Sequence, residues 1–248
     1  MSQSAKRRAV VTGAASGIGK AAAERLLREG ADVIAVDLAA DKLGPLAAAG
    51  CTALAADVAD PAGRAKIVAA ADGVDYLVNA AGIIGLKSIF EVTLEDWRRV
   101  FAVNTESIFF LCQQIGPRMK PGGAIVNLSS SSAKLATTVE VATYAASKTT
   151  ILSITRSFAY ALSSRPIRVN AICPGIVDTP MQDRVLEGVA PMRGLSVAAL
   201  KEQRNKNVPL GRGSSPEECA GLIWFLLSDE SSYMTGQAIN FTGGMVNW

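Results

Sequence analysis

The chain of 248 residues contains no histidine. This absence excludes a serine–histidine–aspartate triad, a zinc site with imidazole ligands and proton transfer by an imidazole ring. Any acid–base chemistry must therefore use tyrosine, lysine, aspartate, glutamate or cysteine side chains.

Cysteine is also scarce, and its four positions are far apart in the sequence: Cys51, Cys112, Cys173 and Cys219. No two of them form a C-x-x-C pair, so the sequence indicates neither a metal-binding motif nor a redox motif. We therefore predict no metal site. Buried, reduced thiols in a cytoplasmic protein are the interpretation that this spacing favours.

The chain also has few charged residues and no long apolar run. Charged residues make up 19% of the chain, and the net charge of +3 is too small and too evenly spread to indicate a nucleic-acid partner. The most apolar stretches, 108–111 and 222–227, are far shorter than the roughly 20 residues that span a bilayer, and the run at 9–11 is too short for a signal peptide. We expect a soluble cytoplasmic protein without a membrane or nucleic-acid partner.

Short β-rich runs alternate with helical patterns along the whole chain, and no linker or repeat divides it. This alternation predicts one α/β domain, residues 1–248, with a seven-stranded parallel sheet and helices on both faces. The expected strands are 8–11, 32–36, 52–55, 74–78, 123–128, 167–172 and 237–241. The expected helices are 17–29, 61–71, 94–119, 142–163 and 216–227.

One connection in this plan is unusually long. Residues 181–207 are polar, contain Pro191 and Gly194, and occupy a place where the link from strand to helix should be short. Long connections inside compact α/β domains are usually lids or binding loops. We expect a lid over about 181–212.

A glycine-rich turn follows the first strand and begins the first helix. Gly13 permits a tight turn, Gly17 lets the backbone approach a pyrophosphate, and Gly19 allows close packing of helix on strand. A phosphate would then lie at the helix N-terminus, where free N–H groups and the helix dipole favour an anion.

The second strand ends at Asp37, eighteen residues after Gly19. A carboxylate at this place can accept hydrogen bonds from both hydroxyls of an adenosine ribose, and it repels a 2′-phosphate. Ser16 and Leu38 flank the site instead of a basic residue. The sequence therefore predicts NAD rather than NADP as cofactor.

Tyr144 and Lys148 are four residues apart in a helical pattern and so project from one face. A phenol with an ordinary pKa near ~10 is a poor base at neutral pH. A nearby ammonium group stabilises the phenolate and lowers that pKa, so we expect Tyr144 to act as a general acid and base.

The spacing Gly-x-x-x-Gly-x-Gly resembles the short-chain dehydrogenase/reductase family, and further motifs carry the resemblance over nearly the whole chain. They are Asp57-Val58 after the third strand, Asn79-Ala80-Ala81-Gly82 after the fourth, Asn104, Tyr144-x-x-x-Lys148 and the segment Pro174–Thr179. Ala80 departs from the second Asn that is usual in the family.

The resemblance implies a Rossmann fold and assigns roles to these positions. It implies that Asn104 and Lys148 belong to the catalytic set and that Lys148 also holds the nicotinamide ribose. The implied cofactor contacts are Gly13, Ser16, Gly17, Ile18, Gly19, Asp37, Asp57, Val58, Asn79, Ala80, Gly82, Tyr144, Lys148, Pro174, Gly175, Val177 and Thr179.

A serine should donate to the substrate oxygen, where charge develops in the reaction. Four serines are consecutive, from Ser129 to Ser132. The family's commonest serine–tyrosine spacing selects Ser131, whereas counting from the strand, where Asn127-Leu128-Ser129-Ser130 resembles Asn-Ile-Ser-Ser, selects Ser130. Because loops absorb insertions more readily than strand ends, we favour Ser130.

The implied reaction is NAD-dependent hydride transfer between a secondary alcohol and a ketone. Tyr144 moves the proton, Ser130 orients the oxygen, Lys148 tunes Tyr144, and Asn104 supports a water relay to Lys148. A 3-oxoacyl carrier-protein reductase and a polyol or sugar dehydrogenase are alternatives within the family. A catalytically silent dinucleotide-binding sensor is an alternative outside enzymes, which the intact catalytic set disfavours.

The substrate is a small molecule, and two features bear on its class. Asp37 and the serine–tyrosine spacing of fourteen resemble the branch that includes 3-hydroxybutyrate dehydrogenase type 2 and 2-keto-3-deoxy sugar acid dehydrogenases, although Val141 stands where that branch can carry a substrate-binding Arg. The expected lid is also rich in basic residues: Arg184, Arg193, Lys201, Arg204, Lys206 and Arg212. A solvated loop is the favoured explanation of these charges. The alternative is that the lid binds a substrate carboxylate, which a guanidinium does bidentately, and Arg184 and Arg193 are then the favoured candidates.

The helix that carries Tyr144 is apolar on more than one face, from Ile151 to Leu162. One face must cover the sheet, so the other indicates a partner subunit. The chain end, after Gly243-Gly244, is apolar and is expected at an interface. We expect a homo-oligomer, with a tetramer favoured over a dimer by the family resemblance, and light scattering at micromolar concentration measures this.

Overall fold

A computed structural model describes residues 6–136 and 138–248. Seven strands form one sheet in the order β3-β2-β1-β4-β5-β6-β7, and every neighbouring pair is parallel. The strands are β1 Arg8–Thr12, β2 Asp32–Asp37, β3 Thr52–Ala55, β4 Tyr76–Asn79, β5 Ala124–Leu128, β6 Arg168–Pro174 and β7 Ala238–Phe241. The predicted seven-stranded parallel sheet is confirmed.

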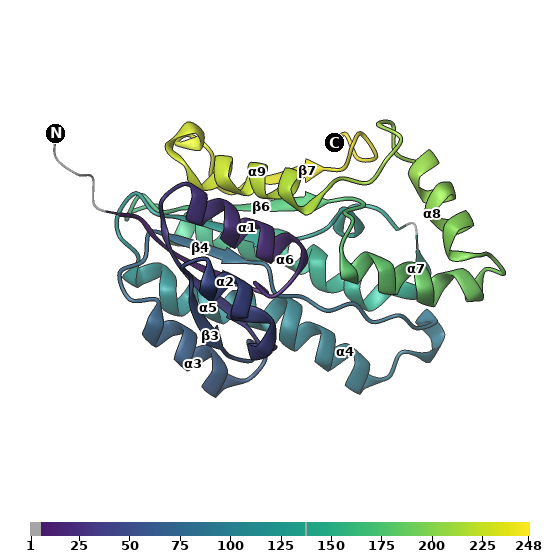
Figure 1. The fold of residues 1–248 in the computed structure, drawn as a ribbon, viewed down its shortest axis with the longest axis horizontal. Helices are drawn as coiled ribbons and strands as arrows, with labels where there is room; N and C mark the ends of the chain where they lie inside the picture. Colours follow the sequence, from purple (N-terminus) through teal and green to yellow (C-terminus); the bar gives the residue numbers. More distant parts are fainter. Residues whose placement is uncertain (1–5, 137) are drawn as a thin grey trace.

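Helices cover both faces of this sheet (Figure 1). Those with eight or more residues are α1 Gly17–Arg28, α3 Pro61–Ala70, α4 Leu94–Phe101, α5 Ser107–Ile115, α6 Ala142–Ala161, α7 Pro180–Met192, α8 Val197–Lys206 and α9 Pro216–Leu227. A shorter helix, α2, spans Gly44–Ala48 and was not predicted from the sequence. Brief 3₁₀ turns occupy Ala40–Leu43, Ile89–Glu91, Gly116–Arg118, Ser131–Ala133, Val139–Val141 and Asp229–Ser231.

Two apolar clusters fill the layers on either side of the sheet. On one side α1 packs against α9, and Leu26, Ile223 and Leu226 are buried there. On the other side α3, α5 and α6 contribute Ile67, Ile115 and Ile151, among others. The central strands are buried on both faces, which explains why their sequences are continuous apolar runs.

The single helix predicted at 94–119 is interrupted in the structure. A π-helical turn, η3, occupies Ala102–Glu106 between α4 and α5. Both flanking segments have good helical patterns, so the sequence alone showed no break. π turns cluster at functional sites because they change the direction of individual side chains within a helix.

The predicted loop at 181–207 is mostly helical, which corrects the sequence interpretation. The hydroxyl of Thr179 accepts a hydrogen bond from the N–H of Gln182 and begins α7, and the hydroxyl of Ser196 accepts one from Ala199 and begins α8. A third apolar cluster, which includes Leu186 and Leu200, joins the two helices. Both lie beyond the end of the sheet (Figure 1).

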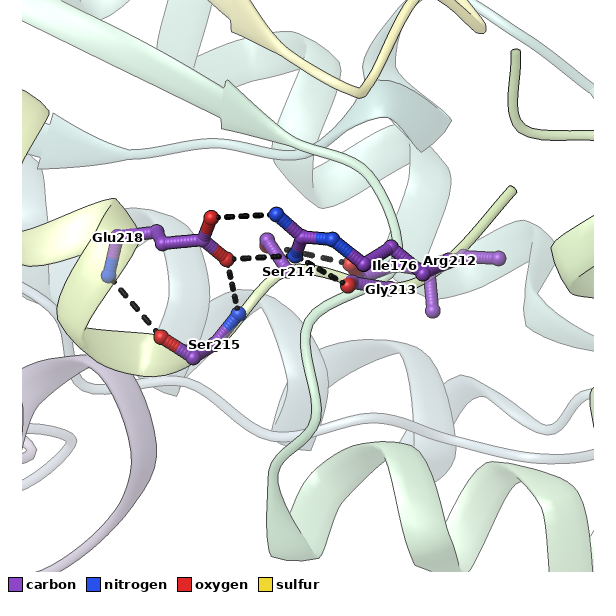
Figure 2. Close-up of polar contacts among 6 residues, drawn as sticks. All are labelled: Ile176, Arg212, Gly213, Ser214, Ser215 and Glu218. Atoms are coloured by element: carbon purple, nitrogen blue, oxygen red, sulfur yellow. Dashed lines mark hydrogen bonds and ion pairs between the residues drawn. The ribbon is translucent and has the colours of Figure 1, made fainter. Parts of the chain in front are cut away.

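The segment after α8 is tied to α9 and to the strand end of β6. Arg212 donates to both carboxylate oxygens of Glu218, at 2.8 and 2.7 Å, and Glu218 completes a capping box with Ser215 (Figure 2). The hydrogen bond from Arg212 is the main reason that the pKa of Glu218 is lowered to about 2. Ser214 then donates its N–H to Ile176 at 2.9 Å, which fixes the segment that follows β6.

All four cysteines are free and buried, as the sequence predicted. Burial raises the pKa of Cys51 to about 11 and that of Cys112 and Cys219 to about 12. No helix in the described ranges is long and apolar enough to cross a membrane.

Gly63 makes a testable contribution to the fold. It lies in the first turn of α3, where a Cβ atom would stand 2.0 Å from the backbone oxygen of Asp57. We expect Gly63→Ala to lower the free energy of unfolding by about 1–3 kcal/mol through overpacking. For a chain of this size, each kcal/mol lowers Tm by about 2–4 °C, which thermal unfolding followed by circular dichroism measures.

Gly44→Ala is the matched control, because Gly44 has helical backbone angles and a Cβ atom there would meet nothing within 4 Å. This variant should unfold at or slightly above the Tm of the unmodified protein. Equal melting temperatures for the two variants would show that the close approach at Gly63 does not affect the free energy of unfolding.

Candidate active site

A cavity of about 390 Å³ lies at the carboxyl edge of the sheet, where the strand order places β1 beside β4. Ligands of open parallel sheets bind at such a point, because the connections from the two strands run in opposite directions and leave a crevice. The cavity collects side chains from the loops after β1, β2, β3, β4, β5 and β6 and from α6, α7 and α8.

The glycine-rich turn forms one wall of the cavity. Gly13 has a φ of +69°, and a Cβ atom on it would lie 2.7 Å from the backbone of Ala81. A Cβ atom on Gly19 would lie 2.1 Å from the carbonyl oxygen of Gly13, so helix and turn approach as closely as the sequence predicted. The hydroxyl of Ser16 makes no capping hydrogen bond to α1, and the first turn of α1 has no acidic residue. The N-terminal amides of α1 are therefore available to a phosphate.

Asp37 is held in a fixed orientation at the end of β2. Its two carboxylate oxygens each accept one backbone N–H bond at 3.0 Å, from Ala15 and from Ala39. The carboxylate lines the cavity, and each oxygen keeps a lone pair for a further donor. This arrangement fits the two ribose hydroxyls of an adenine dinucleotide.

The loop after β3 brings Asp57 and Val58 to the same end of the cavity. Asp57 accepts the N–H of Ala59 at 2.8 Å, and the guanidinium of Arg64 donates to the carbonyl oxygens of Val58 and Ala59 at 2.9 and 2.8 Å. These bonds hold the loop in one conformation. The cradle of glycines, free amides and ordered carboxylate therefore fits a dinucleotide.

Tyr144 and Lys148 lie one turn apart on α6, and both line the cavity. The Lys148 Nζ atom is 5.6 Å from the centre of the Tyr144 ring and donates to the carbonyl oxygen of Leu128 at 2.7 Å. Burial lowers the pKa of Lys148 to about 8.

The expected lowering of the Tyr144 pKa is not what the structure shows. Burial raises the pKa of Tyr144, and the adjacent Ser130 hydroxyl only partly opposes this effect. In this structure, removal of the phenol from water therefore outweighs stabilisation of the phenolate.

Of the four consecutive serines, Ser130 is the one whose hydroxyl lowers the pKa of Tyr144. Its oxygen also accepts the N–H of Ser132 at 3.1 Å, so Ser130 caps the 3₁₀ turn that begins at Ser131. Ser129 also lines the cavity, but its hydroxyl donates to the carbonyl oxygen of Lys148 in α6 at 2.8 Å. Ser131 also lines the cavity.

Asn104 is fully buried in the π turn and does not line the cavity. Its amide nitrogen donates to the carbonyl oxygen of Ile83 at 2.9 Å and to the Ser147 hydroxyl at 3.0 Å, and its oxygen accepts the N–H of Ile83 at 2.8 Å. It holds the loop after β4 against α6, beside Lys148. The water relay from Lys148 through Asn104 stays a prediction.

The structure brings the other predicted cofactor residues to the cavity with one exception. Asn79 is buried in the core, where it donates to Asn127 at 2.9 Å and links β4 to β5. The predicted contacts that do line the cavity are Gly13, Ser16, Gly17, Ile18, Gly19, Asp37, Asp57, Val58, Ala80, Gly82, Tyr144, Lys148, Pro174, Gly175, Val177 and Thr179.

Of the two favoured lid arginines, only Arg184 reaches the cavity. Arg193 pairs with Glu140 at 3.3 Å, away from the cavity lining, which corrects its expected place. Arg204, on α8, does line the cavity. In the sequence Arg204 was only one basic residue of the lid. Its spacing of four residues from the apolar Leu200, which is buried in the structure, was the signal that could have distinguished it.

Comparisons with known proteins agree with this geometry. A family profile described as enoyl-(acyl carrier protein) reductase, a group of short-chain dehydrogenases, matches residues 13–246. A solved short-chain dehydrogenase family protein from Francisella tularensis superimposes with a TM-score of 0.88 at 31% identity, covering 97% of this chain and 99% of that one. The chain belongs to the short-chain dehydrogenase/reductase family.

Three curated relatives show the range of the family around this chain. It is 37% identical to a 3-oxoacyl-[acyl-carrier-protein] reductase from Thermotoga maritima over 96% of each chain. It is 39% identical to a D-threitol dehydrogenase from Mycolicibacterium smegmatis, covering 95% of this chain and 91% of the relative. It is 33% identical to a 2-keto-3-deoxy-L-fuconate dehydrogenase from Xanthomonas campestris, covering 97% and 80% respectively. Proteins of this family are oxidoreductases that typically use a nicotinamide cofactor.

Lys148 provides a test of the site's electrostatics. We expect one lysine to titrate with a midpoint near pH 8 in the cofactor-free protein, because burial lowers its pKa from the ordinary 10.5. Below pH 8 the group is an ammonium ion and above it a neutral amine. Nuclear magnetic resonance of ¹³C-labelled lysine side chains measures the midpoint, and Lys148→Met assigns the signal by removing it.

The sign of the effect on stability follows from the same shift. Between pH 8 and 10.5 the unfolded chain binds this proton and the folded chain does not, so this group contributes rising stability with rising pH over that range. A Lys148 midpoint at the ordinary value would contradict the burial that the structure shows.

Proposed function

We propose that the protein is an NAD-dependent oxidoreductase that interconverts a secondary alcohol and a ketone by hydride transfer. The observation that carries this proposal is a single cavity, which the glycine turn and Asp37 line at one end and Ser130, Tyr144 and Lys148 line at the other. We place the enzyme in the cytoplasm as a homo-oligomer, with a tetramer favoured.

NAD, when bound, accepts the hydride on its nicotinamide ring. The residues that would hold it are the glycine turn and α1 N-terminus for the pyrophosphate, Asp37 for the adenosine ribose, and Lys148 for the nicotinamide ribose. Pro174, Gly175, Val177 and Thr179 also line the cavity, and we propose that they would contact the nicotinamide.

The chain's own residues move the proton. In the oxidative direction Tyr144 first releases its own phenolic proton to solvent. The substrate carbon then loses a hydride, with its electron pair, and the hydroxyl oxygen loses its proton to the Tyr144 phenolate. The C–O bond becomes a carbonyl, and Tyr144 is again a phenol. Ser130 donates to the substrate oxygen and stabilises its developing charge, whereas the Lys148 ammonium favours the deprotonated phenol when Tyr144 gives up its proton.

A small hydroxy acid or sugar-derived acid is the substrate class that we propose, supported by the sugar-acid dehydrogenase among the relatives.

Reduction of 3-oxoacyl carrier-protein substrates is the alternative that the Thermotoga relative suggests. The fixed carboxylate of Asp37 disfavours it, because NADPH needs a basic pocket. Polyol oxidation, suggested by the threitol dehydrogenase, uses the same catalytic set. A silent dinucleotide sensor would not need Ser130, Tyr144 and Lys148 in one cavity.

Tyr144→Phe tests the role of the phenol. We expect kcat to fall by about 10²–10⁴-fold, because general acid–base catalysis is lost. NADH binding, measured by fluorescence, should remain nearly unchanged.

Ser130→Ala should lower kcat more than Ser131→Ala, since Ser130 is the serine whose hydroxyl lowers the pKa of Tyr144. The reverse order for the serines would move the substrate-orienting role to Ser131.

Asp37→Ala tests the cofactor. The substitution removes both the ribose acceptor and the charge that repels a 2′-phosphate, so NAD should bind more weakly and the preference over NADP should narrow. Steady-state kinetics with each cofactor measure the ratio. If the unmodified enzyme turns over NADP faster than NAD, the assignment of NAD is wrong.

A further inference from the structure

The charged residues that line the cavity are divided by sign. Asp37 and Asp57 come from β2 and the loop after β3, on one side of β1 in the sheet order. Lys148, Arg184 and Arg204 come from α6, α7 and α8, which are connected to β5 and β6 on the other side. Within the described ranges, no acidic side chain lines the half of the cavity that Tyr144 occupies. This half therefore carries a positive potential that favours an anionic substrate.

Arg204 lies on the covered face of α8 because of its position in the helix. Leu200, one turn earlier, is 1% exposed and belongs to the apolar cluster that joins α7 to α8. Residues i and i+4 share a helix face, so the packing of Leu200 directs Arg204 toward the interior as well. Arg204 is accordingly half-buried, in contrast to Lys201 and Lys206 on the same helix, which are exposed.

Four other basic residues of the lid have carboxylate partners. Arg193 pairs with Glu140, Lys201 with Asp178 at 3.4 Å, Lys206 with Glu202 at 2.7 Å and Arg212 with Glu218. Among the residues that the structure describes, Arg204 has neither a salt bridge nor a side-chain hydrogen bond.

A half-buried guanidinium without a partner loses part of its hydration and gains no compensating charge, so a nearby anion would stabilise it. Burial, and then the nearby charge of Arg193, hold the pKa of Arg204 below its usual value. Arg184 also lines the cavity but is exposed to solvent, so its charge is screened by water. The Arg204 guanidinium is therefore the lining group best placed to bind an anion that enters the cavity.

We propose that Arg204 binds the carboxylate of the substrate and makes the enzyme selective for short hydroxy acids over the corresponding neutral alcohols. The selectivity in turnover rests on the proposed function. The binding of a carboxylate to Arg204 does not depend on it. A planar guanidinium binds a carboxylate through two parallel N–H bonds, which also fixes the orientation of the acid.

The kinetic test compares a matched pair of alcohols, 3-hydroxybutyrate and 1,3-butanediol, which differ by the carboxylate. We expect Arg204→Met to lower kcat/KM for the acid by about 30-fold or more, as is typical when one partner of a buried charge pair is removed. The loss for the diol should be several-fold smaller. Arg204→Lys should recover part of the activity on the acid, because an ammonium keeps the charge but not the bidentate geometry.

Lys206→Met is the matched control, since it removes a positive charge from the solvent-exposed side of the same helix. It should leave both substrates unaffected. Thermal unfolding of each variant verifies that α8 remains folded. Equal losses for acid and diol in Arg204→Met would assign the residue a structural role and overturn the inference.

A second readout does not need turnover. Calorimetry measures the binding of malonate, a small dicarboxylate, to the unmodified protein in the presence of NAD. We expect Arg204→Met to weaken this binding by at least about tenfold and Lys206→Met to leave it unchanged. Malonate that fails to bind, or that binds equally well to Arg204→Met, overturns the inference.

The two readouts distinguish the two proposals. If neither alcohol, nor a wider panel of hydroxy acids and polyols, reduces NAD while malonate binding still depends on Arg204, the carboxylate site stands and the proposed oxidoreductase function fails. If alcohols are oxidised but acids have no advantage that depends on Arg204, the function stands and the carboxylate site fails.

Discussion

The loops after β1 and β4 approach each other more closely than side chains would allow, and the rest of the site depends on this contact. The Thr12 hydroxyl accepts the N–H groups of Ala80 and Ala81, both at 3.2 Å. A Cβ atom on Gly13 would lie 2.7 Å from Ala81. Because the connections from β1 and β4 leave the sheet in opposite directions, this contact seals the base of a crevice whose walls are the remaining loops.

Buried amides and hydroxyls extend this contact into the catalytic half of the molecule. Asn79 bonds Asn127, which donates to Thr155 of α6 at 3.1 Å, and Asn104 joins the loop after β4 to Ser147 of the same helix. Hydrogen bonds between buried polar groups in a low-dielectric interior are costly to break. The helix that carries Tyr144 and Lys148 is therefore fixed relative to the strand ends by polar bonds as well as by apolar packing.

In the lid region most basic side chains are paired with nearby carboxylates, and within the described residues Arg184 and Arg204, which line the cavity, have no such partner. Surface ion pairs such as Lys206–Glu202 contribute little to stability. Their effect is instead to neutralise most of the basic side chains that the sequence places in this region. The guanidinium of Arg204 is the one that helix packing turns toward the cavity, and an unpaired charge near a reaction centre has a stronger effect than several paired ones at the surface.

Local sequence patterns were sufficient to predict the sheet, the glycine turn and the place of Asp37. Continuous apolar runs predict buried parallel strands. A glycine spacing and a carboxylate at a strand end can be interpreted without knowing how distant segments of the chain fold. The tertiary structure decided three features that local patterns do not contain. The π turn breaks the helix predicted at 94–119, and from this turn the side chain of Asn104 bonds Ile83 in a loop 21 residues away in the sequence. Arg193 is removed from the site by Glu140, a partner 53 residues away. Burial of Tyr144 reverses the predicted direction of its pKa shift. In each case the deciding contact or burial joins segments that are distant in the sequence, and only the folded chain brings them together.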